Sequence, residues 1–148
     1  RSGALTDTAA AEGWNIVNEQ TAEWNAEKAQ QIVQSVIDAG TPFNVIYAEN
    51  DDMAKGAVAA LDKANISHGV GKDVIVMGFD CNKWALQELL DQNWNYDGQC
   101  NPFQASYIDD IIKKLENGET ISEKTIIMDE KGFDATTITQ EDVDNYGI

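Results

Sequence analysis

Residues 43–61 constrain the fold of this chain more than any other stretch. Residues 43–48 form a short apolar run rich in β-branched and aromatic side chains, which predicts a buried strand. After a short polar turn, apolar residues recur at helical spacing, at positions 53, 57, 58 and 61, and predict a helix with one face toward a core. A strand that leads directly into such a helix is the repeating unit of a parallel α/β sheet.

The polar turn between this strand and helix, residues 49–52, is the first candidate for a ligand site. Either Asn50 or Asp51 can cap the helix, and the acidic side chains suit the positive end of the helix dipole. In open parallel sheets, ligands bind outside the carboxyl ends of the strands. We therefore expect Asn50 to contact a ligand.

The flanking segments repeat this strand and helix pattern. Further strands are predicted at residues 14–18, 74–79, 94–99 and 125–128. Further helices are predicted at residues 5–11, 26–39 and 84–90, and another lies between Pro102 and Gly118 with a buried face of five apolar side chains: Phe103, Ile108, Ile111, Ile112 and Leu115. This order predicts an α/β fold, a three-layer sandwich with a mostly parallel, doubly wound sheet. The acidic tail that follows carries little structural signal.

Length and charge limit the classes of partner. With 148 residues and 43% hydrophobic content, the chain is long enough for one domain with a core. Ten basic against 26 acidic residues give a formal net charge of −16, which disfavours nucleic acid and anionic membrane surfaces as partners. The sequence has no apolar run of bilayer-spanning length, and it opens without an initiator Met or a signal peptide, so we expect a piece of a longer protein.

Polar or flat side chains follow each successive predicted strand. The residues that would meet at the carboxyl edge of the sheet are Trp24, Asn50, Asp80, Gln99 and Cys100. Amide and carboxylate groups match vicinal hydroxyls, and an exposed indole offers a flat face to a sugar ring, so the set predicts a carbohydrate site. The alternatives are that Asn50 and Asp80 only cap helices and that Trp24 is a core residue.

Catalytic and metal-binding patterns are absent from the sequence: GxSxG, GxGxxG, the P-loop, HExxH and DxDxDG do not occur. We therefore expect no enzyme activity, cofactor or metal site, and the adjacent acids Asp51 and Asp52 are only weak candidates for acid–base chemistry. Cys81 and Cys100 lie outside any CxxC or Cys/His cluster. Two unbridged small residues and a single disulfide both fit the sequence.

Four segments together are typical of one family: TAEWNAEKA at residues 21–29, YAENDDMAKGAVAAL at 47–61, VIVMGFD at 74–80 and QCNP at 99–102. In this order and spacing they resemble the ribose/galactose class of periplasmic sugar-binding proteins, which have the type I fold and feed ABC importers. The resemblance covers nearly all of this chain but only the carboxyl-terminal half of the family's two-lobed fold.

The resemblance implies roles for individual residues. Trp24 stands where the family has its ring-stacking aromatic residue, and Asn50 and Asp80 stand where it has ligands of the sugar hydroxyls. Arg1 is similar to the arginine of an R-x-x-G-F segment that also binds the sugar. Many members of the family have a glutamine where this chain has Cys100, so the hinge contact there departs from the family pattern.

The resemblance also implies how the chain is divided and what it does. Residues 1–100 would form the carboxyl-terminal sugar-binding lobe, and residues 101–148 a crossing helix, strand and tail that pack partly on the amino-terminal lobe. The lobes would close on a monosaccharide, and the protein would deliver it to the permease of an ABC transporter, in the periplasm or, as a lipoprotein, on the outer surface of a bacterium.

Two other classes of protein compete with this interpretation. One is the effector-binding domain of a LacI-type transcription regulator, which resembles the same fold. The other is a doubly wound enzyme that uses Asp51, Asp52 or Asp80. The acidic charge and the absence of a helix-turn-helix segment oppose the first, and the absence of an acid–base motif opposes the second.

Overall fold

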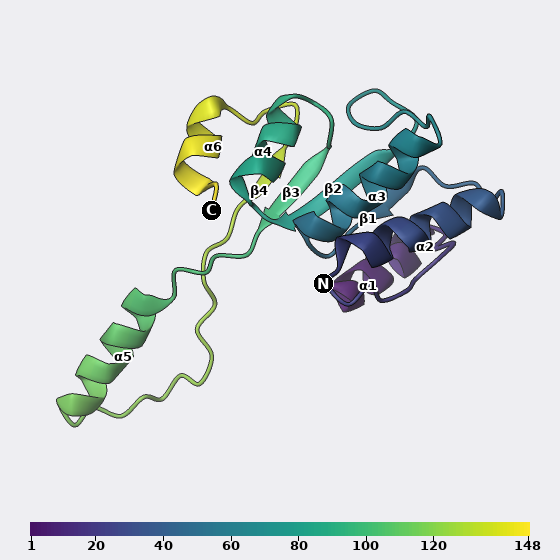
Figure 1. Ribbon diagram of the computed structural model, residues 1–148. Coiled ribbons are helices and arrows are strands. Elements are labelled where there is room, and N and C mark those ends of the chain that lie inside the picture. The colour runs from purple at the N-terminus through teal and green to yellow at the C-terminus, as the bar shows by residue number, and fades with distance from the viewer.

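A four-stranded sheet forms the centre of the computed structural model, which describes residues 1–148. The strands are β1 (Val45–Tyr47), β2 (Ile75–Asp80), β3 (Tyr96–Gln99) and β4 (Gly132–Asp134), and they lie in this order across the sheet. The first three strands pair in parallel, and β4 runs antiparallel to β3 (Figure 1). The prediction of a mostly parallel α/β sheet is therefore confirmed.

Helices flank the sheet on both faces. The helices around the sheet are α1 (Ser2–Glu12), α2 (Ala26–Asp38), α3 (Asp51–Lys63), α4 (Lys83–Leu90) and α6 (Gln140–Tyr146), whereas α5 (Ala105–Glu116) stands away from it. Gly78 of β2 faces Asp51 of α3, whereas the neighbouring Phe79 lies under Arg1 at the start of α1. Because successive strand residues point to opposite faces, α3 and α1 lie on opposite sides of the sheet. None of these helices combines the length and apolar content needed to cross a membrane.

The core lies between the sheet and the helices α3 and α4. Its largest fully buried apolar side chains are Trp94, Leu61, Leu86, Leu89, Val74 and Val76. Helix α2 covers α3 from outside, and the backbone of Ala26 approaches Gly56 so closely that a side chain at position 56 has no room. Glycine at this position therefore permits the close packing of α2 on α3.

We expect Gly56→Ala to destabilise the chain by about 1–3 kcal/mol, because the new methyl group would overlap the Ala26 carbonyl and force α2 away from α3. Gly3→Ala is the matched control, since a Cβ at Gly3 meets no other atom within 4 Å and alanine favours a helix. Urea unfolding followed by circular dichroism measures both variants. Equal stabilities would contradict this account of the helix contact.

The predicted strand at residues 14–18 is wrong. These residues form an irregular loop, and β1 is the edge strand of the sheet on this side. Trp14 is 59% exposed, while Ile16 and Val17 line a pocket against α2 and β1. The alternation of apolar and polar residues here reflects packing of the loop over neighbouring elements, without the backbone pairing that a strand requires.

The predicted strand at residues 125–128 is also wrong, and the last strand begins at Gly132 instead. Ile127 is 89% exposed, so its β-branched side chain marks no core position. A Cβ at Gly132 would collide with the side chain of Tyr96, and glycine therefore lets the chain approach β3 at this point. The composition of residues 125–128 favours a strand, but β4 forms at Gly132–Asp134, where a glycine leaves room for Tyr96 of β3.

The tail, for which the sequence showed little structural signal, forms β4 and α6. A capping box between Thr139 and Asp142 begins α6. Val143 of α6 is 1% exposed, and Phe133 of β4 is also buried. The tail therefore packs on the sheet and on α4.

Helix α5 projects away from the sheet on two long connections (Figure 1). It contains no buried residue, so the prediction of a buried face between Pro102 and Gly118 is wrong for this chain. The apolar side chains lie in solvent, with exposures of 70% for Phe103, 53% for Ile108, 48% for Ile112 and 56% for Leu115. The amphipathic pattern is real, but the face has no partner within residues 1–148.

We expect Leu115→Ala in α5 to change the free energy of unfolding by less than about 0.5 kcal/mol, because the side chain buries nothing in this chain. Leu86→Ala in α4 should cost about 2–5 kcal/mol, because Leu86 is 0% exposed in the core. Equilibrium unfolding in urea compares the two variants. A large loss from Leu115→Ala would show that α5 packs on the sheet in solution.

Candidate functional site

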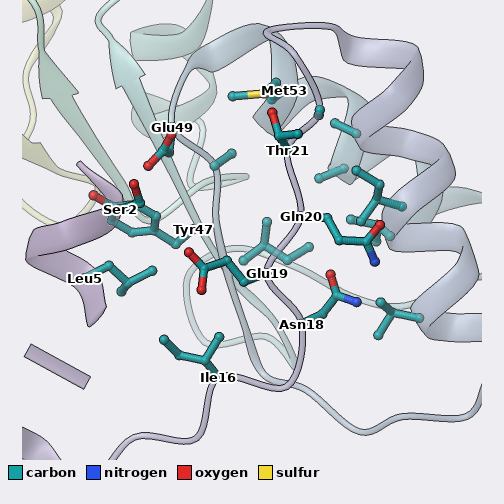
Figure 2. Close-up of a pocket in the computed structure, with 18 of the residues that line it drawn as sticks. Ser2, Leu5, Ile16, Asn18, Glu19, Gln20, Thr21, Tyr47, Glu49 and Met53 are labelled. Carbon is teal, nitrogen blue, oxygen red and sulfur yellow. The ribbon is translucent and has the colours of Figure 1, made fainter. Parts of the chain in front are cut away.

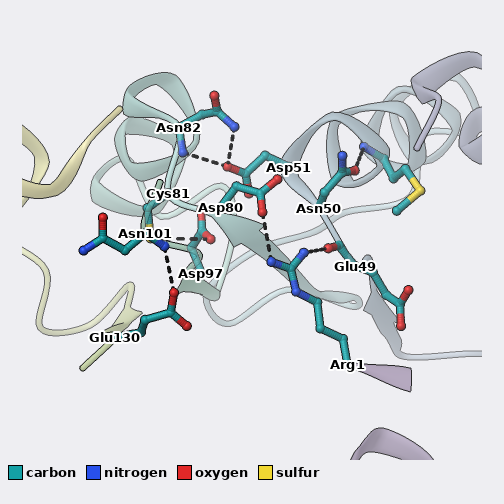
Figure 3. A network of polar contacts seen from close by, with 11 residues as sticks. Arg1, Glu49, Asn50, Asp51, Asp80, Cys81, Asn82, Asp97, Asn101 and Glu130 are labelled. Atoms are coloured by element: carbon teal, nitrogen blue, oxygen red, sulfur yellow. Dashed lines mark hydrogen bonds and ion pairs between the residues drawn. The ribbon is translucent and has the colours of Figure 1, made fainter. Parts of the chain in front are cut away.

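Arg1 joins the carboxyl ends of β1 and β2. Its Nη2 donates a hydrogen bond to Asp80 Oδ1 at 3.0 Å, and its Nη1 donates to the backbone carbonyl of Glu49 (Figure 3). The guanidinium also lies 4.8 Å from the centre of the Phe79 ring. Three contacts thus hold a cation beside two carboxyl-end turns, where α/β sheets bind ligands.

Asn50 caps α3 and keeps a free donor. Its Oδ1 accepts a hydrogen bond from the backbone N–H of Met53 at 2.9 Å, so the cap alternative is realised. The side-chain amide nitrogen makes no hydrogen bond within the chain and is left to donate elsewhere. The residue can therefore serve both the helix and a ligand.

Asp80 and Cys81 have an unusual backbone conformation. Their φ angles are 115° and 60°, in the region that side chains other than glycine rarely adopt. Such residues cost about 1–3 kcal/mol each and concentrate at ligand sites. The sharp turn lets the Asp80 carboxylate meet Arg1 while the Cys81 side chain is buried.

Gln99 and Cys100 lie at the end of β3 and behave differently from each other. Gln99 is engaged with the connection before β4: its Oε1 accepts from the backbone N–H of Lys131 at 3.2 Å, and its own N–H donates to the Lys131 carbonyl at 2.8 Å. Cys100 is exposed. Both Cys81 and Cys100 are free thiols, so the structure supports the unbridged alternative.

A pocket of about 570 Å³ lies beside this cluster, between α1, the loop at residues 16–24, α2, β1 and the start of α3 (Figure 2). Most of its lining is apolar, and Trp24 is part of it. Trp24 is 62% exposed with φ 59°, so it is a surface residue and not a core residue. Glu49 links the two regions, because it lines the pocket while its carbonyl accepts from Arg1.

Asp51 does not face the open part of the site. It is 0% exposed, and its Oδ2 accepts two hydrogen bonds from Asn82, from the backbone N–H at 2.8 Å and from Nδ2 at 3.0 Å. Burial raises the pKa of Asp51 to about 6 despite these donors. A sealed carboxyl group of this kind is unsuited to acid–base chemistry on a bound substrate.

The structure therefore brings some of the predicted residues together and separates others. Arg1 and Asp80 are in direct contact, and Asn50 follows the Glu49 carbonyl that Arg1 binds. Trp24 lies on the adjoining pocket, whereas Gln99 is tied to the chain before β4. No group of three or more His, Cys, Asp or Glu side chains is arranged to hold a metal ion.

Sequence reasoning missed two aromatic residues at the site. Tyr47 and Phe79 lie on the same face of β1 and β2, with ring centres 5.2 Å apart in an edge-on arrangement. Phe79 supports the Arg1 guanidinium. Alternate residues of a strand share a face, so Phe79 lies on the same side of β2 as Met77. Met77 pairs with Tyr47 of β1, which places both aromatic rings on one face of the sheet.

Asparagine, carboxylate and guanidinium groups next to an exposed indole suit a ligand rich in hydroxyl groups. Comparison with known families identifies the class of protein. The model of the periplasmic binding protein domain matches residues 2–119, and the chain belongs to this family. The resemblance seen in the sequence motifs is therefore confirmed.

Several relatives have names that describe sugar binding, and their matches extend over most of this chain. The fructose import binding protein FruE of Bifidobacterium longum is 32% identical over 132 residues, which are 88% of this chain and 38% of that protein. A Mycobacterium smegmatis structure in complex with β-D-fucofuranose has a TM-score of 0.72 at 28% identity, over 82% of this chain and 39% of that one. This chain thus spans less than half the length of these relatives.

A third comparison concerns the fold alone. The periplasmic binding protein of the arabinose ABC transporter from Shewanella sp. ANA-3, bound to L-arabinofuranose, has a TM-score of 0.83 at 24% identity. The match covers 92% of this chain and 45% of that structure. The fold of this chain therefore corresponds to a little under half of that structure.

We expect Asn50→Ala to lower the free energy of unfolding by about 1 kcal/mol, because α3 would lose the acceptor for the Met53 N–H. Asn50→Asp should keep the stability, since a carboxylate accepts the same hydrogen bond and suits the helix N-terminus. Thermal unfolding at neutral pH measures both. Equal losses in the two variants would contradict the cap.

Proposed function

We propose that this chain is the carboxyl-terminal, sugar-contacting part of a solute-binding protein that captures a monosaccharide by closure of two lobes and delivers it to an ABC importer. The observation that carries the proposal is the cluster of Arg1, Asp80 and Asn50 at the carboxyl ends of β1 and β2, beside the exposed Trp24. The protein binds and releases its ligand without chemical change, and it is not an enzyme.

Each contact residue has a distinct part in the proposed capture. The Asp80 carboxylate accepts from sugar hydroxyls, and the guanidinium of Arg1 and the free amide nitrogen of Asn50 donate to them. Trp24 covers the C–H face of the ring, because its indole is already exposed. Cys100 lies at the end of β3, where the hinge contact is expected, with Gln99 beside it.

The second lobe comes from the remainder of the protein. Residues 1–100 form the sugar-binding lobe in this proposal, and the exposed apolar face of α5 within residues 101–148 packs partly on the amino-terminal lobe. Two facts support this: the chain spans only 38% of FruE, and α5 has no partner within this chain. The lobe that closes over the site excludes water and completes the set of hydrogen bonds.

Membership of the periplasmic binding protein family implies a location outside the cytoplasm, in the periplasm or at the cell surface. We further propose that a bacterial membrane anchors the protein as a lipoprotein near its permease. The relatives name fructose, fucofuranose and arabinofuranose, so pentoses and hexoses are the ligands to test. The net charge of −16 opposes binding to nucleic acid and, with it, the regulator alternative.

The chain alone should bind a monosaccharide weakly, with a Kd of about 1 mM or higher, because half of the hydroxyl partners and the closing lobe are missing. NMR titration with D-fructose, D-ribose, L-arabinose and D-galactose detects affinities of this size. We expect the indole N–H signal of Trp24 to shift on binding. Trp14, which is also well exposed at 59% but does not line the pocket, serves as the internal control.

Asn50→Asp should weaken binding at least about tenfold without lowering stability, because the cap survives and the donor to the sugar is lost. Trp24→Ala should weaken it similarly, and Trp14→Ala should not. Equal effects at Trp14 and Trp24, or unchanged affinity in Asn50→Asp, would refute the proposed site. Micromolar binding by this chain alone would refute the need for a second lobe.

A further inference from the structure

Two carboxyl groups meet in the interior behind the proposed sugar contacts. Asp51 at the start of α3 and Asp97 in β3 are both 0% exposed, and Figure 3 shows both side chains. A Cβ on Gly78 would lie 2.6 Å from Asp51 Oδ1, and Gly78 is the register partner of Asp97 across β2 and β3. The two carboxyl groups therefore meet over the same face of the sheet. The oxygens of two ionised carboxylates cannot donate, so a hydrogen bond between them requires a proton.

The other contacts of the pair show which oxygens share that proton. Asp51 Oδ2 is occupied by two donors from Asn82, and Asp97 Oδ1 lies 3.8 Å from the Cys81 thiol, which donates to it. The two oxygens that remain, Asp51 Oδ1 and Asp97 Oδ2, are buried and find no donor among the other groups of the chain. One proton between them satisfies both atoms.

The surroundings favour the ionised form of Asp51 and the protonated form of Asp97. Asp51 receives two N–H donors and lies at the positive end of α3, whereas Asp97 receives only the weak thiol donor and a backbone contact from Cys81. Asp80 is the nearest further carboxylate and adds repulsion to both. The positive charge of Arg1 is engaged with Asp80.

We infer that Asp51 and Asp97 share one proton. This pair, here called the latch, positions the two turns that carry the proposed sugar contacts, residues 49–52 and 80–82. This inference rests on the proposed function for its consequence, because Asn50 directly precedes Asp51 and Asp80 lies two residues before Asn82, the donor to Asp51. Asp97 connects Asp51, and through it Asn82, to β3. Loss of the shared proton would place two buried negative charges in contact and push the turns apart.

The latch gives the chain a defined response to pH. Burial raises the pKa of Asp51 to about 6 and that of Asp97 to about 9, so the pair holds one proton between these values. Unfolded aspartates release their protons near pH 4. The folded chain therefore binds more protons than the unfolded chain up to about pH 9, and its stability falls as the pH rises through this range.

Infrared spectroscopy of the chain with carboxyl-labelled aspartate tests the proton directly at about pH 7.5, between the two values. We expect a protonated-carboxyl band in the wild-type chain and its loss in Asp97→Asn. Asp52→Asn is the matched control, since Asp52 is an exposed acid on the same turn of α3, and it should keep the band. Absence of the band from the wild-type chain would overturn the latch.

Thermal unfolding as a function of pH tests the link between proton binding by this pair and the stability of the chain. The amide that Asp97→Asn introduces can donate to Asp51 Oδ1 as the protonated carboxyl does, and it does not titrate. Asp97→Asn should therefore melt at least about 5 °C above the wild-type chain at about pH 9 and show a flatter profile. Asp52→Asn should follow the wild-type profile. Parallel profiles for Asp97→Asn and the wild-type chain would overturn the latch.

Titration with D-fructose and D-ribose at several pH values tests the positioning role. Wild-type affinity should fall at least about threefold between pH 7.5 and pH 10, and that of Asp97→Asn should fall by less. An equal fall in both proteins would overturn the positioning role. If no protein in the set binds either sugar, the proposed function fails for these ligands, while the infrared and unfolding measurements still decide whether the pair holds its proton.

Discussion

The parallel pairing of β1 with β2 is the interaction on which the candidate site depends. Its register places Tyr47 beside Met77, so the turns that follow the two strands emerge at the same edge of the sheet. Arg1 can then reach the Glu49 carbonyl and the Asp80 carboxylate at once. A shift of one residue in this register would turn the strand side chains to opposite faces and separate these partners.

The same short turns form the fold and the site. Asn50 begins α3 through one atom of its amide and offers the other to a ligand, while its neighbour Asp51 is sealed against Asn82 and Asp97. The strained backbone at Asp80 is tolerated because contacts on both sides of the turn hold it. Stability and ligand geometry at this edge are therefore coupled through adjacent residues.

The sequence predicted the parts of the molecule that local pattern determines. The strand at 43–48, the helix after it and a cap at Asn50 or Asp51 follow from periodicity and spacing within a few residues, and Asn50 is the cap in the structure. The proton-sharing partner of Asp51 could not be predicted in this way, because Asp97 is distant in the sequence and meets it only through the strand order. The predictions of a strand at residues 14–18 and of a buried face on α5 were wrong for a related reason. An amphipathic pattern shows that one side of a segment is apolar, but it does not show which surface, if any, packs against that side.

The charges at the site indicate what kind of ligand it accepts. The chain carries a net charge of −16, and Arg1, the cation at the cluster, is paired with Asp80 at 3.0 Å. Little unbalanced positive charge is left to attract a phosphate or a carboxylate. What remains available is hydrogen-bonding capacity, at the Asn50 amide and the free lone pairs of Asp80, together with the flat face of Trp24. A neutral, polyhydroxylated molecule uses these groups without requiring a net charge at the site, and this favours a sugar over an anionic solute.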